Sequence, residues 1–285
     1  MNNKYIIENV DSFNIEQIFK CGQAFRWIEE ENGSFTNIAH GKVINIEKKD
    51  NNIIINNSSE EDYNNIWRNY FDMDRNYKIL KEKLSKDDIL KKCIEYGNGI
   101  RVLNQEPFEI IITFIISANN QIPRIQKSVN KIAQMYGKKI DYNNKEYYGF
   151  PSPEELAKAK AEDLREFAKV GFRDERIVES AKIIANNEIN IESLYTMELE
   201  EARKELMKLP GVGPKVADCC LLFAFKRSES FPVDVWIKRV MEELYLHKDT
   251  NKNRIADEGR RLFGKDAGLA QQYLFYYGRE NKLGL

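Results

Sequence analysis

Hydrophobic and polar positions alternate in short runs over the first ninety or so residues of the chain. β-Branched or alternating runs occupy residues 5–10, 35–39, 43–47 and 53–55. They are separated by Gly33, by Gly41 and by the turn Asp50-Asn51-Asn52. Because a period of two places one set of side chains on one face of a sheet, these runs predict short strands. The intervening turns favour an antiparallel meander.

From Tyr77 onward the hydrophobic spacing is that of helices. Ser152-Pro153-Glu154-Glu155 has the form of a capping box, so we expect a helix from there to Val170, ended by Gly171. Further helical patterns run up to 185, over 199–208, from 214, and over 267–277. The chain therefore predicts an α+β fold, with an N-terminal antiparallel sheet domain over residues 1–95 and a mostly α-helical domain over residues 96–285.

The charges of the chain are balanced. Lys and Arg number 44 against 45 Asp and Glu, which gives a formal net charge of -1. An excess of basic residues usually indicates a polyanionic partner, so this balance at first disfavours nucleic-acid binding.

Scarce residue types exclude several kinds of site. Two histidines, His40 and His247, disfavour His-based zinc sites and Ser-His-Asp triads. The four cysteines form no C-x-x-C pair, which disfavours a zinc ribbon or an iron–sulfur centre and fits a reducing cytosol. The N-terminus has no apolar leader, and no stretch approaches 18 apolar residues. We expect a cytoplasmic, full-length, monomeric protein that does not enter the membrane and holds no metal or other cofactor.

Two predicted helices flank the loop Leu209-Pro210-Gly211-Val212-Gly213, which is the pattern of a helix-hairpin-helix. Gly211 and Gly213 allow positive φ and leave backbone N–H groups uncovered at the start of the next helix. Such a loop can bind a phosphate without net positive charge. Taken alone, the same pattern also fits a plain αα-hairpin with glycine caps.

Lys215 follows Pro214 in the first turn of the second helix, where the helix dipole disfavours a cation and so favours a neutral, nucleophilic amine. The alternative is a solvated surface lysine. Cys219 lies four residues later on the same face, where a thiol could pack against a flat base or simply fill the core. Asp234 is a natural N-cap of the following helix, and a carboxylate held there could also face a developing positive charge.

These residues carry a resemblance to a known family. The run from Leu209 to Cys219, followed by Phe231-Pro232-Val233-Asp234-Val235, resembles the signature of helix-hairpin-helix (HhH-GPD) base-excision DNA glycosylases, and among them the 8-oxoguanine DNA glycosylase/AP lyases. Further matching motifs stand in the same order at 22–27, at 119–124, at 171–173, and at Gln271 with Phe275. The family fold is an antiparallel sheet domain followed by a two-lobed helical domain, in agreement with the organisation predicted above.

The resemblance implies a bifunctional enzyme that acts on double-stranded DNA containing 8-oxoguanine. Lys215 would attack the sugar C1′ of a flipped-out nucleotide, expel the base and form a Schiff base that undergoes β-elimination. Asp234 would stabilise the positive charge that develops in the transition state. The carbonyl of Gly22 matches the family's acceptor for N7–H, a donor that 8-oxoguanine has and guanine lacks. Gln271 would bind the base edge, and Phe275 would stack on its ring.

The resemblance also implies a set of DNA contacts. Asn119, Arg124 and Arg173 match residues that fill the gap and bind the estranged cytosine, and Phe172 matches an aromatic wedge. Either arginine could equally be an exposed arginine without a partner in the free protein. The segment 121–139 holds five basic residues and no acidic one, so a local basic face could follow the phosphates, with acidic residues lying away from it and from Lys215.

The chain departs from the family pattern at several positions. Trp236 and Gly278 stand where animal members carry a phosphate-contacting histidine and its aspartate, Phe172 replaces a tyrosine, and Gln121 and Pro123 alter an Asn-rich turn. We therefore expect looser selectivity for the base opposite the lesion. Two alternatives stay open: a related glycosylase with another damaged base as substrate, and a non-catalytic helix-hairpin-helix module that only binds duplex DNA.

Overall fold

The N-terminal part of the chain forms one antiparallel sheet in the computed structural model, which describes residues 3–284. In spatial order the strands are β1 (Lys4–Ile7), β5 (Asn52–Asn56), β4 (Lys42–Lys49), β3 (Phe35–Ala39) and β2 (Ile28–Glu29). Strands β3, β4 and β5 follow one another as in the predicted meander. The sequence pattern does not predict β2, and the first predicted strand, β1, pairs with β5 at the edge instead of with β3, with Tyr5 opposite Ile55.

Short helices cover the sheet and bury its aromatic core. They are α1 (Ile15–Lys20), α2 (Glu60–Asp62), the π-helical turn η1 (Tyr63–Trp67) and α3 (Arg68–Tyr70). Trp67 and Phe71 are fully buried against Ile44, Ile46 and Ile53 of the sheet. The sequence pattern predicts helices only from Tyr77, so these turns are missed, because each is too short to show a helical period.

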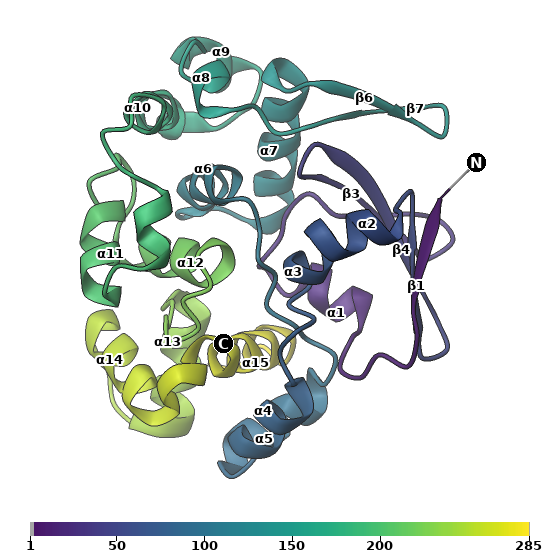
Figure 1. Ribbon diagram of the computed structural model, residues 1–285. Helices are drawn as coiled ribbons and strands as arrows, with labels where there is room; N and C mark the ends of the chain where they lie inside the picture. The colour runs from purple at the N-terminus through teal and green to yellow at the C-terminus, as the bar shows by residue number, and fades with distance from the viewer. Residues whose placement is uncertain (1–2, 285) are drawn as a thin grey trace.

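The rest of the chain is mostly helical and surrounds a second core (Figure 1). Its α-helices are α4 (Tyr77–Leu84), α5 (Asp88–Tyr96), α6 (Pro107–Ser117), α7 (Ile122–Tyr136), α8 (Pro153–Leu156), α9 (Ala161–Glu166), α10 (Asp174–Ala185), α11 (Leu199–Leu206), α12 (Pro214–Ala224), α13 (Val235–Met241), α14 (Lys252–Phe263) and α15 (Ala267–Glu280). Irregular turns join them at η2 (Gly171–Arg173), η3 (Glu192–Tyr195), η4 (Glu242–Leu246) and η5 (Gly264–Asp266). The predicted α+β class is confirmed.

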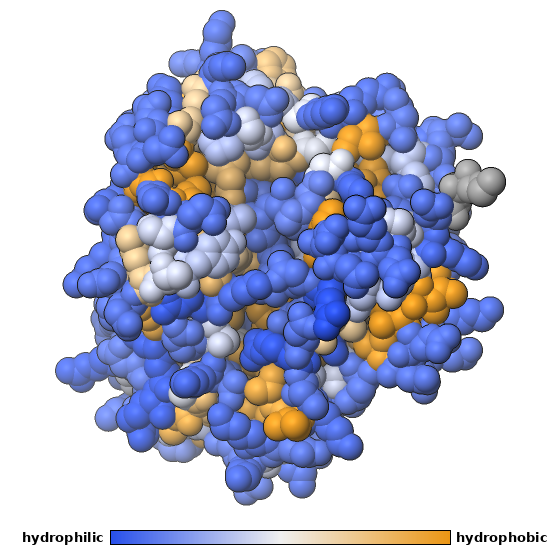
Figure 2. All heavy atoms as spheres, viewed as in Figure 1, coloured by the Kyte–Doolittle hydropathy of each residue, from blue (hydrophilic) through white to orange (hydrophobic). Residues whose placement is uncertain are grey.

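Helices α4 and α5 belong to this second core although they precede residue 96. Tyr77, Leu90 and Cys93 are buried in it, and α5 packs on α15. The helical part is thus built in two lobes, one from α6 to α12 and one from α4, α5 and α13 to α15 (Figure 1). The face shown in Figure 2 is mainly hydrophilic, with apolar side chains in separate small groups.

One local prediction in the helical part is wrong. The capping box of Ser152 and Glu155 forms as expected, but the helix that it starts ends at Leu156. The chain is extended at Lys160 before α9 begins, which lets Leu156 and Leu164 both pack against α10. A hairpin of β6 (Lys139–Tyr142) and β7 (Lys145–Tyr148) also interrupts the helices and packs on the N-terminal sheet through Tyr147.

Candidate active site

A cavity of about 820 Å³ lies between the two helical lobes and is closed on one side by the loop after α1. Most of the predicted site residues line it, although they come from five separated segments. These are Gly22, Asn119, Gly211, Gly213, Lys215, Cys219, Asp234, Trp236, Gln271 and Phe275. Arg124, Phe172 and Arg173 do not line it. The structure therefore brings the predicted reacting and base-contacting residues together and leaves three predicted DNA contacts outside the cavity.

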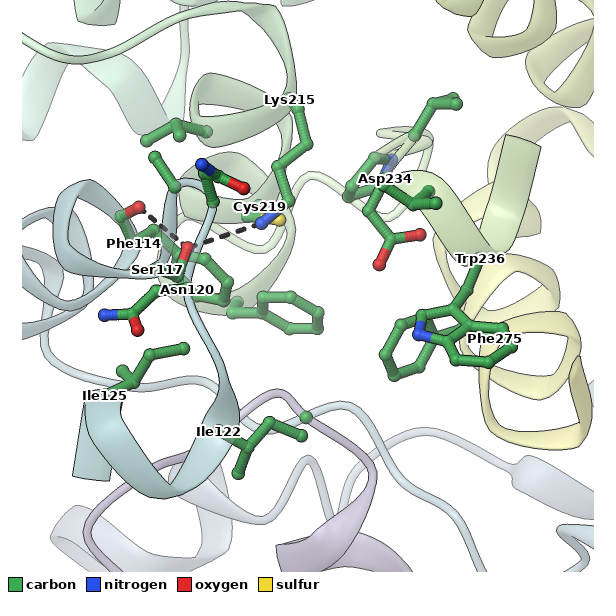
Figure 3. A pocket seen from close by; sticks show the side chains of 18 of the residues that line it. Phe114, Ser117, Asn120, Ile122, Ile125, Lys215, Cys219, Asp234, Trp236 and Phe275 are labelled. Atoms are coloured by element: carbon green, nitrogen blue, oxygen red, sulfur yellow. Dashed lines mark hydrogen bonds between the residues drawn. The ribbon is translucent and has the colours of Figure 1, made fainter. Parts of the chain in front are cut away.

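Lys215 lies in the first turn of α12, where Gly213 and Pro214 start the helix as predicted. Its amine Nζ donates a hydrogen bond to Ser117 Oγ at 3.4 Å and lies 5.0 Å from the centroid of the Phe114 ring (Figure 3). Ser117 in turn donates to the Phe114 carbonyl at 2.8 Å, so its oxygen faces the amine. Ser117 thus holds the amine inside the cavity, where Lys215 is half-buried.

Asp234 enters the same cavity from the opposite side (Figure 3). It is the N-cap of α13, and its Oδ1 accepts the Ile237 N–H at 2.8 Å, as the sequence predicts. Its second oxygen is left for the cavity. Among the described residues that line the cavity, Asp234 is the one acid, beside the cations Lys215, Lys252 and Arg279. A positive charge that develops between Lys215 and Asp234 therefore meets one fixed carboxylate.

Cys219 and Phe275 form the apolar walls of the cavity. Cys219 is 4% exposed, and burial raises the pKa of its thiol to about 12, so the thiol is neutral at physiological pH. Phe275 and Trp236 both line the cavity (Figure 3), and the Arg279 guanidinium lies 5.4 Å from the centroid of the Phe275 ring. Trp236 is thus part of the cavity wall. It adds an aromatic surface at the position where animal members of the family carry a phosphate-contacting histidine.

Gly22 borders the Phe275 ring so closely that only glycine fits without a shift. Its φ is +82°, and a Cβ there would lie 3.0 Å from Phe275 Cε1. Both facts favour glycine, since L-residues rarely adopt this φ. The Gly22 backbone can therefore approach a flat ligand that stacks on Phe275.

Gln271 is buried in the wall next to the Asp234 loop. Its Nε2 donates to the Pro232 carbonyl at 3.2 Å, and its Oε1 accepts from Gln272 Nε2 at 2.8 Å. The amide is therefore held at both ends before any ligand binds.

The hairpin loop offers free backbone donors beside the cavity. Gly211 has a φ of +87°, and within residues 3–284 no acceptor lies in hydrogen-bond range of the N–H groups of Gly211 and Gly213. Gly213 also has open space where a Cβ would be. An anion can approach these N–H groups together with the start of α12.

Phe172 and Arg173 lie in η2, just before α10 and outside the cavity, and they differ in exposure. Phe172 is 59% exposed, as a wedge would be. The alternative of an exposed Arg173 is wrong: it is 7% exposed, and its guanidinium donates to the backbone carbonyls of Val170, at 3.1 Å, and of Ala118 and Asn119. Arg173 thereby ties this loop to Asn119, which has a φ of +51°.

The basic face of α7 is only partly as predicted. Arg124, Lys127 and Lys131 are exposed, and no ion pair forms at any of them within the described chain. Lys139, at the other end of the segment, pairs with Glu146 at 2.5 Å and with Asp141 at 3.4 Å. The expectation that acidic residues lie away from the whole segment is wrong at this end, because the β6–β7 hairpin folds them back against Lys139.

Sequence reasoning missed several residues of the cavity, among them Phe114, Ser117, Gln272 and Arg279. Ser117 stands two positions before the Asn119 motif, but nothing in the sequence pairs it with Lys215. Across residues 3–284, no helix is both long and apolar enough to cross a bilayer, and no cluster of three or more His, Cys, Asp or Glu side chains could bind a metal.

The comparisons with known families cover nearly the whole chain. Residues 5–111 match the 8-oxoguanine DNA glycosylase N-terminal domain, and residues 112–265 match the HhH-GPD superfamily of base excision DNA repair proteins. A probable N-glycosylase/DNA lyase of Methanothermobacter thermautotrophicus is 34% identical over 75% of this chain and 72% of its own length. The N-glycosylase/DNA lyase of Saccharomyces cerevisiae is 32% identical over 85% and 71%.

Solved structures agree with these matches. The Clostridium acetobutylicum 8-oxoguanine glycosylase/lyase, in complex with duplex DNA containing cytosine opposite 8-oxoguanine, superimposes with a TM-score of 0.96 at 43% identity over 99% of each chain. Its apo form gives a TM-score of 0.93 at 43% identity, over 97% of this chain and 98% of that one. The family predicted from five separated sequence motifs is confirmed, and the chain belongs to the 8-oxoguanine DNA glycosylase/lyase branch of the HhH-GPD superfamily of base excision repair proteins.

Proposed function

We propose that this protein excises 8-oxoguanine from duplex DNA and then cleaves the strand, with Lys215 as nucleophile and Asp234 as its electrostatic partner. The observation that carries the proposal is their placement: an amine and a carboxylate enter one cavity from opposite sides, next to an aromatic platform. A nucleotide flipped into this cavity can present its sugar to the amine and its base to Phe275.

The chemistry follows from the amine. Lys215 attacks C1′ and forms a C–N bond, the glycosidic bond breaks, and its electron pair leaves with the base. Opening of the sugar ring gives an imine. Loss of a proton from C2′ then breaks the bond from C3′ to the 3′ phosphate oxygen, and hydrolysis of the imine releases the enzyme. No step needs a metal or an oxidant.

Asp234 stabilises the positive charge that develops on the sugar during this reaction. Its carboxylate is anchored by the Ile237 N–H, so it does not need to reorganise when positive charge develops on the sugar. The N–H groups of the hairpin bind a phosphate of the same strand and fix the sugar relative to Lys215.

The base is selected by the slot between Cys219 and Phe275. A neutral, buried thiol and an aromatic ring suit a flat, uncharged base. We infer that the Gly22 carbonyl accepts the N7–H of 8-oxoguanine and repels the N7 lone pair of guanine.

Borohydride trapping tests the assignment. The full chain, incubated with a duplex that holds one 8-oxoguanine, should nick it without added metal and form a covalent adduct on reduction. Lys215→Gln should bind the same duplex and form no adduct, whereas Lys204→Gln, which changes an exposed lysine on α11, should trap normally. An adduct with Lys215→Gln would refute the role of this lysine as the nucleophile. Binding without nicking by the wild type would refute the proposed lyase activity.

A further inference from the structure

A chain of three buried side chains runs through the cavity wall, from the Asp234 loop to the loop that carries Gly22. Gln271 donates to the Pro232 carbonyl, Gln272 Nε2 donates to Gln271 Oε1 at 2.8 Å, and Gln272 Oε1 lies 3.5 Å from Cys21 Sγ. Gln272 is 2% exposed and Cys21 is fully buried. Cys21 precedes Gly22, and Gln272 follows Gln271. The neighbours of these two predicted base-contacting residues are thus joined by a hydrogen bond, although 251 positions separate them in the sequence.

The polarity of this chain is fixed from the Pro232 end. A carbonyl oxygen such as that of Pro232 can only accept, so it requires the nitrogen of Gln271 to face it. The oxygen of Gln271 then faces Gln272, which must present its own nitrogen. The oxygen of Gln272 is left for Cys21, whose single S–H is shared between this oxygen and the Ile18 carbonyl at 3.3 Å. Burial keeps that thiol protonated, because it raises the pKa of Cys21 to about 11.

The orientation of Gln271 decides which base edge it accepts. With its nitrogen on Pro232, its oxygen keeps a second lone pair for a donor on the ligand. The Watson–Crick edge of 8-oxoguanine has a donor at N1–H, whereas that of 8-oxoadenine has an acceptor at N1. Both lesions carry N7–H and O8, so the Gly22 carbonyl cannot tell them apart. Selection of 8-oxoguanine over 8-oxoadenine must come from elsewhere in the cavity.

We propose that Gln272, held by Cys21, is a positioning residue that locks the Gln271 amide with its oxygen as the acceptor and thereby selects a guanine-type Watson–Crick edge. The proposal rests on the excision of 8-oxoguanine inferred above. Gln272 does not act on the reacting atoms; it removes the rotated state of Gln271 in which an NH₂ group would face the base and favour N1 of 8-oxoadenine.

Substitutions of Gln272 separate this role from simple core packing. Gln272→Met keeps the volume and removes the donor, so one of the two anchors of Gln271 is lost. Gln272→Glu places an acceptor against the Gln271 oxygen and repels it, so it should disturb the orientation more. Both variants are expected to lose stability, since a buried amide is lost or left unpaired. Asn104→Leu is the matched control, because it removes another buried amide, which is bonded to the Asn69 carbonyl and makes no hydrogen bond to Gln271, Gln272 or Cys21.

The measurement is the single-turnover excision rate for 8-oxoguanine and for 8-oxoadenine, each placed opposite cytosine in the same duplex. The ratio of the two rates belongs to the folded fraction alone, so partial unfolding does not move it. We expect the 8-oxoadenine to 8-oxoguanine ratio to rise about threefold in Gln272→Met and about tenfold in Gln272→Glu, as expected for one hydrogen bond lost or reversed. Asn104→Leu should leave the ratio at its wild-type value.

The outcomes separate two failures. If the wild type does not excise 8-oxoguanine, the proposed function is wrong. If the wild type excises it, and the ratio in both Gln272 variants stays within experimental error of the wild type, Gln272 only fills the core and the positioning role is wrong. A ratio that rises equally in Asn104→Leu would also overturn it, because any loosening of the fold would then have the same effect.

Discussion

The Nζ of Lys215 and the Oγ of Ser117 lie 3.4 Å apart, and the Ser117 hydroxyl donates its hydrogen to the Phe114 carbonyl. The serine oxygen therefore acts as the acceptor in its hydrogen bond with the lysine. This bond joins α6 to the first turn of α12 and holds the amine over the Phe114 ring. Ser117 thus fixes where the nucleophile stands before DNA binds.

Ser117→Ala is expected to slow base excision by about tenfold, because a hydrogen bond that orients the nucleophile is lost. DNA affinity should stay within about twofold, since the Ser117 hydroxyl is already bonded to the Phe114 carbonyl and to Lys215 Nζ. Single-turnover excision and a binding titration give both values. Ser128→Ala, which changes a buried serine on α7, is the control. An excision rate equal to that of the wild type would show that Ser117 does not position the amine.

Gly22→Ala should reduce excision far more than stability. The added methyl group lies 3.0 Å from Phe275 Cε1 and pushes the platform ring, while the left-handed backbone costs about 1 kcal/mol. Gly33→Ala is a matched control, because Gly33 has a similar φ of +79° and no atom within 4 Å of the added group. The two variants should lose similar free energies of unfolding, and only Gly22→Ala should lose activity. Equal activity in both would show that the Gly22 contact with Phe275 is unimportant.

The chemistry-bearing positions could be predicted because local signals fix them. Gly213 and Pro214 start a helix and so place Lys215 in its first turn, and Asp234 has the residue type and position of an N-cap. The strands at 35–39 and 42–49 follow from alternation in the same way. The hairpin at 139–148 had its own signal in Asn143-Asn144, which both adopt positive φ, but two four-residue strands between helices are easily read as loop.

The partners of these residues could not be predicted, because they depend on contacts between distant segments. Ser117 lies 98 positions before Lys215, and Cys21 lies 251 positions before Gln272. Arg173 is buried only because the α6–α7 turn offers it the Ala118 and Asn119 carbonyls. No pattern along the chain encodes such contacts, since segments far apart in the sequence first have to pack against each other.

Gly278 is a packing requirement of this chain. A Cβ there would lie 2.2 Å from Val240 Cγ2, so the aspartate of animal relatives has no room. Gly278→Ala should therefore lower the free energy of unfolding by about 2 kcal/mol through overpacking. In a Val240→Ala background the same substitution should cost at least about 1 kcal/mol less. Chemical denaturation of the four proteins measures the coupling, and additive losses would show that Val240 is not what excludes a side chain.

Asp218 makes stability depend on pH without facing the cavity. It lies three residues after Lys215, but its carboxylate pairs with Arg203 Nε of α11 at 2.9 Å. Burial raises the pKa of Asp218 to about 7, against the nearby Arg203 and Arg260, whereas an unfolded aspartate has a pKa of about 3.9. The folded state therefore binds more protons between these values, so this group's contribution to stability falls as pH rises from 4 to 7.

Asp218→Asn should remove that slope. Between pH 5 and pH 8 the wild type is expected to lose more free energy of unfolding than the variant, measured by urea denaturation at each pH. Asp163→Asn, which changes a partly buried carboxyl on α9, should keep the wild-type slope. A wild type whose stability rises more steeply than that of Asp218→Asn would mean that Arg203 outweighs burial and keeps Asp218 ionised in the folded state.

We expect the protein to be weakly selective for the base opposite the lesion. The Arg173 guanidinium is occupied by the Val170, Ala118 and Asn119 carbonyls, so few of its N–H groups are left for the acceptor edge of a cytosine. The exposed Phe172 ring can fill the gap by stacking, which does not depend on the base.

We expect excision of 8-oxoguanine paired with cytosine to be within about tenfold of its excision opposite adenine, guanine or thymine, because a stacking contact tolerates every base. Phe172→Ala should slow all four reactions by a similar factor, whereas Phe167→Ala, which removes another exposed phenylalanine on the same lobe, should slow none. Single-turnover rates on the four duplexes give the comparison. A preference for cytosine of about a hundredfold or more would mean that Arg173 leaves its carbonyl partners when DNA binds and reads the estranged base directly.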